Sequence, residues 1–398
     1  MKVMDKTLSY TKPLLETPFH QRTFEACYNN DWYRWAGYKI AREYSNTELE
    51  YTSMRNTAGV LDITPMHKYD IKGKDAIKFV DKLVTRDVTQ IKPNQVMYII
   101  WCNEDGNVID DGTVFCFDKN HLRIFCAERN LNWFSDTAIG FDAEVNDVSD
   151  SIAALAFQGP LSCKILHLLN VKNIEYLKPF FFDSFDLNGS SVTISRTGFS
   201  GDLGYEIWCA PQDAINVWDS LFKFNRDYKV LPAGMNALEM VRIEAGFIQP
   251  NADFMSAEQA LRPNRMRTPF ELGMGWLVDL NKNYFTGKKS LINLKNKSLT
   301  KKLVGLDIQG DKPAIGSVLY DKNKKEIGIV TAGMWSPSLK SNIAFGYVDK
   351  DYMKIGSKVF AEIYHPEELE YKKIWAECLV VKKQFFNPPR RHKVPADI

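Results

Sequence analysis

The feature that most restricts the fold is a pair of adjacent aspartates, Asp110 and Asp111, inside a predicted β-hairpin. Residues 95–102 and 108–117 are rich in strand-forming side chains and flank a Glu-Asp-Gly turn. Neighbouring side chains in a strand point to opposite faces of a sheet, so one carboxylate must lie on the apolar face. Because carboxylates are rarely buried without a partner or a use, the pair indicates either a functional site or an aspartate held by backbone amides.

A second group of residues with functional character is the glycine-rich stretch 196–208. Its closely spaced glycines permit a tight loop whose backbone can approach a ligand. Glu206 follows at the start of a predicted strand, so a further acid lies among apolar neighbours. The spacing matches neither a dinucleotide-binding loop nor a phosphate-binding loop, and ordinary loop geometry also explains the glycines.

Composition and charge exclude several classes of function. A net charge of +2 over 398 residues argues against a nucleic-acid-binding protein. The chain has no run of about 18 apolar residues and no apolar signal sequence at its start, so we expect a cytoplasmic protein without a membrane partner. The seven cysteines form no CxxC pair and the six histidines are scattered, so we expect buried free thiols and no metal site.

The hydrophobic pattern alternates between strand and helix periods, which indicates an α+β protein. Asp75 is the expected N-cap of a helix over 76–84. The polar stretch 251–268 is predicted to be a long loop. A small C-terminal barrel or sandwich is predicted from strands at 303–308, 327–333, 343–348, 358–363 and 375–381.

Short motifs, in the same order along nearly the whole chain, resemble the tetrahydrofolate-dependent aminomethyltransferase family. That family comprises the glycine-cleavage T protein and relatives that demethylate small molecules. The matching motifs are Thr17-Pro-Phe, Trp35-Ala-Gly-Tyr, Gly59-Val-Leu-Asp-Ile-Thr-Pro-Met, Lys92-Pro-Asn-Gln, 103–114, Gln158-Gly-Pro, 198–206, Arg242-Ile-Glu-Ala-Gly, Trp335-Ser-Pro-Ser-Leu and 343–348.

The resemblance implies an α+β fold with three domains around a central channel for tetrahydrofolate and a small C-terminal β-barrel. We expect residues 1–52 and 148–260 to form a discontinuous folate-binding domain. Residues 53–147 are then a second α+β domain, 261–300 a linker or excursion, and 301–398 the barrel.

In the family pattern, Asp111 matches the key carboxylate beside the reactive nitrogen of the pterin, so we expect it to be catalytic. A carboxylate there can orient that nitrogen, stabilise positive charge and accept a proton. Glu206 matches the glutamate that binds the amino-pyrimidine edge. The other candidate cofactor contacts are Met66, Phe199, Tyr98 and Arg242. For Met66 and Phe199, a simple position in the hydrophobic core is an alternative.

Several positions depart from the T protein pattern. Leu238 replaces an arginine that helps to hold folate, which is why Arg242 enters the candidate set. Thr64-Pro65 replaces a Ser-His pair, and 126–129 replaces a strand that ends in asparagine. These departures favour a demethylase that moves a methyl group from a small methylated donor to N5 of tetrahydrofolate.

Aromatic side chains in the matched segments offer a cage for a sulfonium, methylamine or betaine cation, although a core position is the alternative for each. Glu128 is a candidate partner for that cation, and Arg129 for a substrate carboxylate. The candidate donor-binding residues are Trp35, Trp101, Glu128, Arg129 and Trp133.

Two other interpretations remain open. The first is a true T protein, an aminomethyltransferase whose substrate is delivered by a lipoylated carrier protein; it predicts a basic surface near the channel mouth. The second is a non-catalytic folate-binding factor for iron–sulfur assembly. It is less favoured because residues 285–291 lack the cysteine of that branch's motif.

Overall fold

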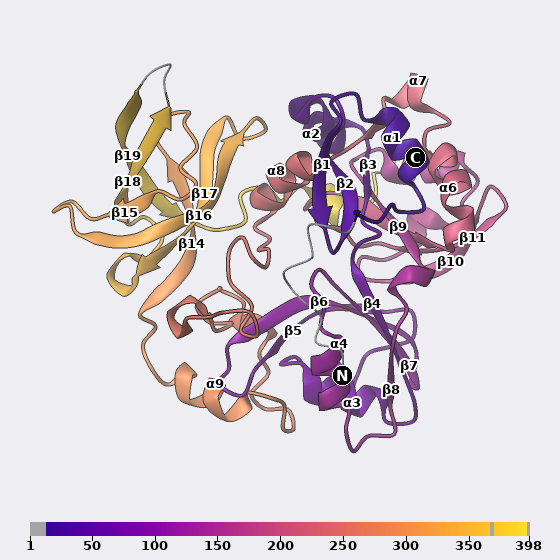
Figure 1. Ribbon diagram of the computed structural model, residues 1–398, viewed down its shortest axis with the longest axis horizontal. Coiled ribbons are helices and arrows are strands. Elements are labelled where there is room, and N and C mark those ends of the chain that lie inside the picture. Colours follow the sequence, from indigo (N-terminus) through magenta and orange to yellow (C-terminus); the bar gives the residue numbers. More distant parts are fainter. Residues whose placement is uncertain (1–12, 367–369, 396–398) are drawn as a thin grey trace.

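The computed structural model describes residues 13–366 and 370–395. Figure 1 shows three lobes arranged around a common centre. Each lobe is built on its own main sheet, and the sheet of the third lobe closes into a six-stranded barrel. The expected α+β class and the small C-terminal barrel are therefore confirmed.

The first lobe contains a six-stranded sheet in the order β10-β11-β12-β9-β3-β13. All pairings are antiparallel except that of β13 with β3. A separate hairpin, β1 (Asp31–Trp35) and β2 (Tyr38–Glu43), accompanies it. The sheet strands are β3 (Gly59–Asp62), β9 (Ala153–Gln158), β10 (Phe182–Leu187), β11 (Ser190–Ser195), β12 (Gly204–Cys209) and β13 (Leu231–Pro232).

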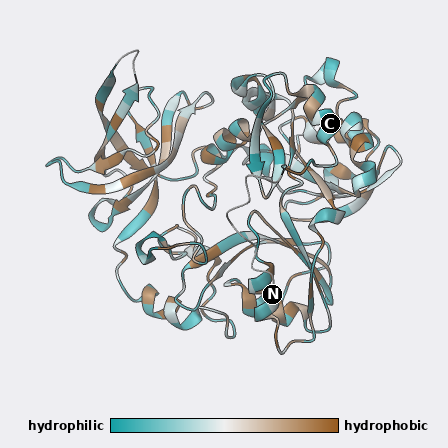
Figure 2. Ribbon diagram, in the orientation of Figure 1, coloured by the Kyte–Doolittle hydropathy of each residue, from teal (hydrophilic) through white to brown (hydrophobic). Residues whose placement is uncertain are grey.

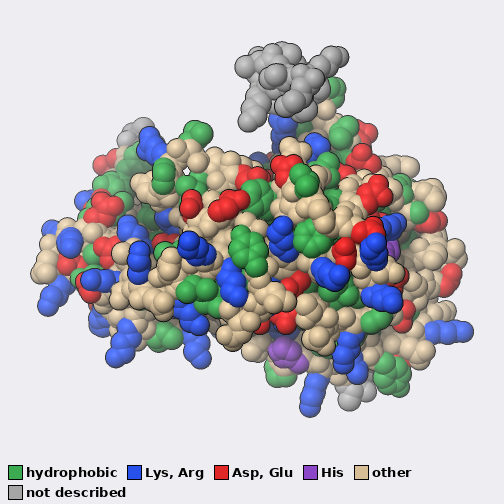
Figure 3. All heavy atoms as spheres, turned by 90° about the horizontal axis from the view of Figure 1, so that it is seen from below, with side chains coloured by type: hydrophobic (Ala, Val, Ile, Leu, Met, Phe, Trp, Pro, Cys, Tyr) green, Lys and Arg blue, Asp and Glu red, His purple; other side chains and the backbone are tan. Residues whose placement is uncertain are grey.

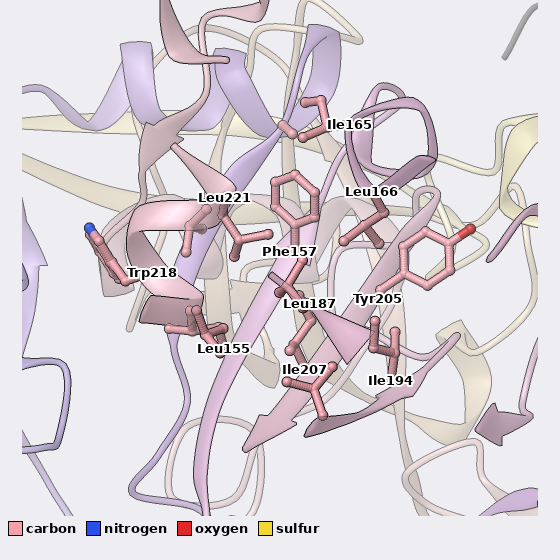
Figure 4. Packing of buried hydrophobic residues seen from close by; sticks show 14 of the residues in the cluster. Leu155, Phe157, Ile165, Leu166, Leu187, Ile194, Tyr205, Ile207, Trp218 and Leu221 are labelled. Carbon is pink, nitrogen blue, oxygen red and sulfur yellow. The ribbon is translucent and has the colours of Figure 1, made fainter. Parts of the chain in front are cut away.

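Helices cover both faces of this sheet because its central strand is apolar on both sides. Leu155 and Phe157 of β9 pack with α1, α5 and α6, as Figure 4 shows for α6. Ala154 and Ala156 face the opposite cluster, to which α2 and α8 contribute. The helices are α1 (His20–Ala26), α2 (Thr47–Asn56), α5 (Ser162–Leu168), α6 (Ala214–Leu221), α7 (Asn225–Tyr228) and α8 (Met235–Ala245).

The second lobe is a five-stranded sheet in the order β5-β6-β7-β4-β8. The predicted hairpin is confirmed as β5 (Val96–Cys102) and β6 (Val108–Asp118). Asp75 is not a side-chain cap of α3, because its carboxylate accepts instead from the Asp142 N–H and Lys78. The remaining elements are β4 (His67–Lys72), α3 (Ala76–Leu83), β7 (His121–Cys126), α4 (Leu131–Thr137) and β8 (Glu144–Asp147).

The chain passes between these lobes through residues 63–66 and 148–152. Because β3 pairs with β9, the first crossing begins after Asp62. We therefore propose a domain boundary near residue 63 in place of residue 53.

Residues 251–300 fill the space between the second lobe and the barrel. The predicted loop over 251–268 contains a single short 3-10 turn, Pro263–Arg265. Near its start, Phe254 forms an isolated β-bridge with Pro250. Phe254, Leu272 and Phe285 are buried in a cluster that also holds residues of β5 and the barrel. Helix α9 (Lys288–Lys295) then leads into the barrel.

The barrel strands follow the closed order β14-β17-β16-β15-β18-β19. Hydrophobic and hydrophilic residues both occur along these strands (Figure 2), and burial alternates along β18. β15 is absent from the predicted set because three residues carry too little periodicity. The strands are β14 (Lys301–Ile308), β15 (Val318–Tyr320), β16 (Glu326–Ser336), β17 (Ser341–Asp349), β18 (Lys358–Pro366) and β19 (Tyr371–Val381).

After β19 the chain returns to the first lobe (Figure 1), where Val394 packs on the core that also holds Phe19 and Trp218. The Phe385 and Phe386 N–H groups donate to the Glu244 carbonyl of α8 at 2.9 and 2.8 Å. Arg390 binds Asp202 through both carboxylate oxygens, at 2.6 and 2.8 Å. We therefore propose that the barrel domain ends near residue 382, not at residue 398.

A buried polar network lies where α2, α8 and the barrel meet. The Arg55 Nε donates to Glu244 Oε2 at 2.8 Å, and both side chains are almost fully buried. The Tyr51 hydroxyl donates to Glu244 Oε1 at 2.6 Å, and the Ser336 hydroxyl of β16 also donates to that oxygen. Arg55 Nη1 also lies 3.7 Å from Asp202, so Arg55 and Arg390 together face the two buried acids Glu244 and Asp202.

All seven cysteines are buried. Among the residues that the structure describes, no helix is both long and apolar enough to cross a membrane. The same residues contain no group of three or more His, Cys, Asp and Glu side chains arranged to hold a metal ion.

Candidate active site

The two aspartates of β6 occupy different environments. Asp110 is fully buried, and its oxygens accept from the Asp111 N–H and the Asn130 side-chain amide, both at 2.8 Å. Burial, reinforced by the neighbouring Asp111 carboxylate, raises the pKa of Asp110 well above its usual range. Asp110 therefore anchors the strand and is the aspartate held by amide groups.

Asp111 is the aspartate that keeps an accessible surface. Its side chain is half-buried, and its Oδ2 accepts from the Tyr98 hydroxyl at 2.7 Å. Burial raises the pKa of Asp111 to about 6, while the Tyr98 hydrogen bond opposes that rise. Gly112 follows because β7 approaches closely: a Cβ there would lie 2.2 Å from the Phe125 carbonyl oxygen.

Glu206 on β12 is held by a chain of hydroxyl groups. Its Oε2 accepts from the Thr197 hydroxyl at 2.5 Å, and Thr197 lies 2.7 Å from the Ser195 hydroxyl. The Ser195 oxygen accepts in turn from the Trp208 indole N–H at 3.3 Å. Burial raises the pKa of Glu206, and the Thr197 hydrogen bond counteracts it.

The glycine-rich loop before Glu206 is built around one side chain, Gln158. Its amide donates to the Tyr205 and Thr197 carbonyls at 3.0 and 3.3 Å. A Cβ at Gly198 or Gly204 would lie 2.1 or 2.3 Å from the Gln158 amide oxygen. These two glycines are therefore needed for packing inside the protein, whatever the loop binds.

An apolar cluster at the contact between the first two lobes brings several predicted residues together. Trp35, Met66 and Phe199 are half-buried and pack on a core that includes Leu238. Phe125 of β7 and Trp208 of β12 belong to the same core, with ring centroids 4.1 Å apart. The cluster therefore joins the sheet that carries Asp111 to the sheet that carries Glu206.

The predicted donor cage does not assemble. Trp101 is a fully buried core residue whose indole N–H donates to Asn130 Oδ1 at 3.2 Å, so its assignment to the donor site is wrong. Trp133 packs on the core of the second lobe, apart from the cluster that holds Trp35. Glu128 is half-buried and Arg129 is exposed on the segment after β7.

Arg242 also has a structural environment. It is fully buried, and its guanidinium donates to Glu239, Asp253 and the Phe247 carbonyl. It lies over the Phe345 ring of the barrel, 5.7 Å from its centroid. With these partners it connects α8 to the barrel, and we do not propose it as a cofactor contact.

Sequence reasoning missed Asn130, Thr197 and Lys68. Asn130 directly follows segment 126–129, which differs from the T protein pattern. The asparagine that this pattern expects at the strand end therefore lies one position after that segment. Thr197 is the second residue of the glycine-rich stretch, and its hydroxyl marks it as a possible carboxylate partner. Lys68 lies in a strand, 67–72, that also contains a histidine, an aspartate and a second lysine, so its sequence context gave no signal.

Two family profiles match the chain. Residues 23–282 match the GCVT N-terminal domain, and residues 301–386 match the glycine cleavage T-protein C-terminal barrel domain. With two half-buried carboxylates beside an apolar cluster, these matches define an enzyme of the tetrahydrofolate-dependent transferase class.

Relatives and a solved structure agree. The chain is 33% identical over 341 residues to an aminomethyltransferase of Caldanaerobacter subterraneus subsp. tengcongensis, covering 83% of this chain and 88% of that protein. It is 34% identical over 328 residues to one from Halothermothrix orenii, covering 81% and 89%. The glycine cleavage system aminomethyltransferase T from Bartonella henselae shares the fold, with a TM-score of 0.83 at 24% identity over 96% of this chain and 99% of that one. The chain belongs to the tetrahydrofolate-dependent aminomethyltransferase family.

The expectation of a small methylated donor is wrong. Relatives that are 30–34% identical over most of the chain are aminomethyltransferases. Leu238, which favoured a demethylase, is a buried member of the apolar cluster, and Trp101 is a core residue. The departure at Leu238 is therefore explained by packing and needs no different donor.

The residues present fit tetrahydrofolate. A pterin offers N–H donors along one edge, and a carboxylate is an acceptor-only group that can take two of them. Asp111 and Glu206 are half-buried carboxylates with accessible surface, next to apolar side chains suited to aromatic rings.

Proposed function

We propose that this protein is the aminomethyltransferase of a glycine cleavage system, acting on an aminomethyl group delivered by a lipoylated carrier protein. The observation that supports this most directly is the half-buried Asp111 carboxylate beside Tyr98. It occurs in a chain that covers 88% and 89% of two aminomethyltransferases. When bound, tetrahydrofolate supplies the nitrogen that takes up the one-carbon unit.

Asp111 is the proposed catalytic residue. With a pKa of about 6 it is mostly ionised at neutral pH, yet its pKa is close enough to neutrality for it to accept a proton. Tyr98 fixes the orientation of the carboxylate, since its hydroxyl donates to Oδ2. The fixed charge can stabilise positive charge that develops nearby with little reorganisation.

We expect Tyr98→Phe to move the acid limb of the pH–activity profile to higher pH. The Tyr98 hydroxyl stabilises ionised Asp111, so its loss raises the carboxyl pKa above about 6. A hydrogen bond to a charged group contributes about 1.5–3 kcal/mol, which corresponds to roughly 1–2 pH units. The measurement is kcat/KM against pH for both proteins, and coincident acid limbs would contradict the assignment of that limb to Asp111.

Glu206, Met66 and Phe199 are the proposed binding residues for the pterin. The Glu206 carboxylate is held in place by Thr197 and keeps capacity for further donors. Met66 and Phe199 lie in the apolar cluster between the lobes. Trp35 belongs to the same cluster, so it is proposed as a wall of this site.

Glu206→Ala is expected to weaken tetrahydrofolate binding by about 10- to 100-fold. An unpaired donor row costs about 1–3 kcal/mol. Isothermal titration measures the change, with Glu175→Ala, a glutamate of the same lobe outside the apolar cluster, as the control. Equal affinity of the Glu206 variant and the unmodified protein would exclude Glu206 from the pterin site.

A carrier partner is supported by a basic segment. Residues 288–302 contain six lysines and no acidic residue. Lys289, Lys295 and Lys297 are exposed, and within the described part of the chain none has a carboxylate partner. Ser290 of α9 donates to the Glu104 carbonyl at 2.8 Å, which places this segment at the turn of the hairpin that carries Asp111.

This basic segment belongs to a face with many cations. Figure 3 views the molecule from the side of Figure 1 that carries α9 and α3, and Lys and Arg side chains are spread across it with Asp and Glu side chains between them. A carrier with an acidic surface would be attracted to the lysines of the basic segment 288–302. The T protein alternative predicted a surface of this kind near the channel mouth.

A product assay tests the proposed function. The purified protein is mixed with tetrahydrofolate and aminomethyl-loaded carrier protein, and products are read by mass spectrometry. Parallel reactions contain dimethylglycine, betaine or a sulfonium acid. Methylenetetrahydrofolate and ammonia from the loaded carrier alone support the proposal; no product with the carrier contradicts it.

A further inference from the structure

The two proposed carboxylates of the site lie on different lobes. Asp111 is on β6 of the second lobe, and Glu206 is on β12 of the first. A ligand that binds both is therefore sensitive to how the two sheets are placed. Within residues 13–260 the chain passes between these lobes through the crossings 63–66 and 148–152. It does so again after α8, where the Ala257 N–H donates to the Val108 carbonyl of β6 at 3.0 Å.

Lys68 joins both crossings at one point. Its side chain is fully buried, and Nζ donates to the Thr64 and Met66 carbonyls at 2.7 and 2.8 Å. These carbonyls belong to the outward crossing. Nζ also donates to the Ser149 carbonyl of the return crossing at 3.5 Å. The backbone adds two further bonds, from Lys68 N–H to Ser149 Oγ at 3.0 Å and from Val148 N–H to the Lys68 carbonyl at 2.9 Å.

The bonds to Lys68 are made by carbonyls and not by an ion pair. In the described residues no carboxylate lies within 4.0 Å of Nζ. Asp62, the acid with the largest electrostatic effect on Lys68, is itself held by the Thr17 hydroxyl at 2.6 Å and the Thr64 N–H at 2.9 Å. An ammonium group has three donors, and three carbonyls take them. The Lys68 ammonium group therefore binds the backbone of the two crossings and not a charged side chain.

One of those carbonyls belongs to a proposed site residue. Met66 follows Pro65, and its N–H closes a turn onto the Ile63 carbonyl at 3.1 Å. Lys68 holds the other side of the same residue through the Met66 carbonyl. The place of the Met66 side chain in the apolar cluster therefore depends on this lysine.

We propose that Lys68 is a positioning residue that holds the Asp111 lobe, the Glu206 lobe and Met66 in the arrangement that binds tetrahydrofolate. This inference rests on the proposed site, and it adds a residue that does not touch the ligand. Its chemistry is donation to backbone carbonyls, so a side chain with N–H donors can serve and an apolar one of similar length cannot.

Lys68→Met, Lys68→Gln and Lys68→Arg test this role. Methionine keeps the length but leaves the carbonyls without a donor, and we expect the Kd and KM for tetrahydrofolate to rise about tenfold or more. Arginine should bring both values back to within about threefold of the unmodified protein. Glutamine keeps two N–H donors, so Lys68→Gln should give Kd and KM values between those of the methionine and arginine variants. It replaces Lys68→Met in the comparison if the methionine variant does not fold.

Lys282→Met is a matched control. Lys282 is also a buried lysine, and its Nζ donates to the Asp81, Val84 and Arg86 carbonyls at 2.5, 3.0 and 2.8 Å. Unlike Lys68 it also pairs with the Asp81 carboxylate at 2.7 Å, so its loss should destabilise the fold at least as much. All three carbonyls lie in the second lobe, so this lysine fixes no crossing. Lys282→Met should lower the melting temperature but leave the Kd for tetrahydrofolate within about twofold.

The outcomes separate this inference from the proposed function. If Lys68→Met and Lys282→Met lower stability alike and neither changes tetrahydrofolate affinity, Lys68 is only structural and the inference is overturned. If the unmodified protein binds tetrahydrofolate but does not use the loaded carrier, the proposed function fails, while the affinity comparison still decides the role of Lys68. If the unmodified protein does not bind tetrahydrofolate, both fail.

Discussion

Asp111→Asn is expected to lower kcat with loaded carrier by at least about 100-fold while the protein still folds and binds tetrahydrofolate. The amide keeps the shape of the carboxylate and an oxygen for the Tyr98 hydroxyl. It lacks the negative charge and cannot accept the proton, and a positioned general base contributes about 10²–10⁴-fold.

The stability of this variant follows from the direction of the pKa change. Burial raises the pKa of Asp111 in the folded protein to about 6, above the ordinary value of an aspartate. The stability linked to this group is complete below its unfolded pKa and is lost as pH rises through about 6. At pH 7 the neutral asparagine therefore removes an unfavourable charge, and the melting temperature should not fall.

The measurements are kcat, tetrahydrofolate affinity and melting temperature. Asp105→Asn is the control, because Asp105 is exposed in the turn of the same hairpin. Its kcat should match that of the unmodified protein. Undiminished turnover in the Asp111 variant would remove this residue from the mechanism.

Arg55→Met is expected to reduce the free energy of unfolding by about 3–5 kcal/mol. The substitution leaves the fully buried Glu244 carboxylate without the Arg55 guanidinium, while Asp202 keeps its bidentate pair with Arg390. Removal of one partner from a buried ion pair typically costs this much, because the remaining charge has lost its solvation. The donors to the Ser200 and Val241 carbonyls disappear as well.

Urea unfolding at neutral pH measures the effect. Arg22→Met is the control: Arg22 pairs with Asp219 at 2.7 and 2.9 Å, but both side chains are accessible. An exposed pair of this kind contributes about 0–1 kcal/mol, so this control should barely move the midpoint. Similar losses of unfolding free energy in the two variants would mean that the buried Arg55–Glu244 pair contributes no more to stability than an exposed ion pair.

Much of the secondary structure could be predicted because it depends on local periodicity. The hairpin of β5 and β6 appears within one residue of the predicted bounds, since alternating apolar residues flank a clear turn. β15 was missed because it exists only through its pairing with β16 and β18. The predicted Asp75 cap failed for a similar reason, since its carboxylate binds a backbone N–H 67 residues away.

The site was predicted in part. The Asp pair was found because charged side chains contradict a strand pattern, but the pattern alone could not tell which aspartate is anchored. The strand partners Trp101 and Ile100 are both fully buried, so the side-chain partners decide it: Asp110 accepts from Asn130 and Asp111 from Tyr98. The aromatic cage failed because an aromatic residue in a strand carries no sign of the face it occupies until the partner strands are known.

The donor could not be derived from single substitutions. Leu238 stands where an arginine was expected, yet it is fully accounted for by apolar packing. Lys68 was equally opaque, since its partners at Thr64 and Ser149 come together only when both crossings are formed. Such long-range contacts leave little trace in one sequence.

The return of the C-terminal segment to the first lobe has a consequence for biosynthesis. Phe385 and Phe386 bind the Glu244 carbonyl, Arg390 binds Asp202, and Val394 packs on the core that also holds Phe19. A ribosome releases these residues only after the sheets of all three lobes. The first lobe is therefore expected to reach its final packing after the barrel has been translated, and a nascent chain that still lacks residues 385–394 would keep that core incomplete.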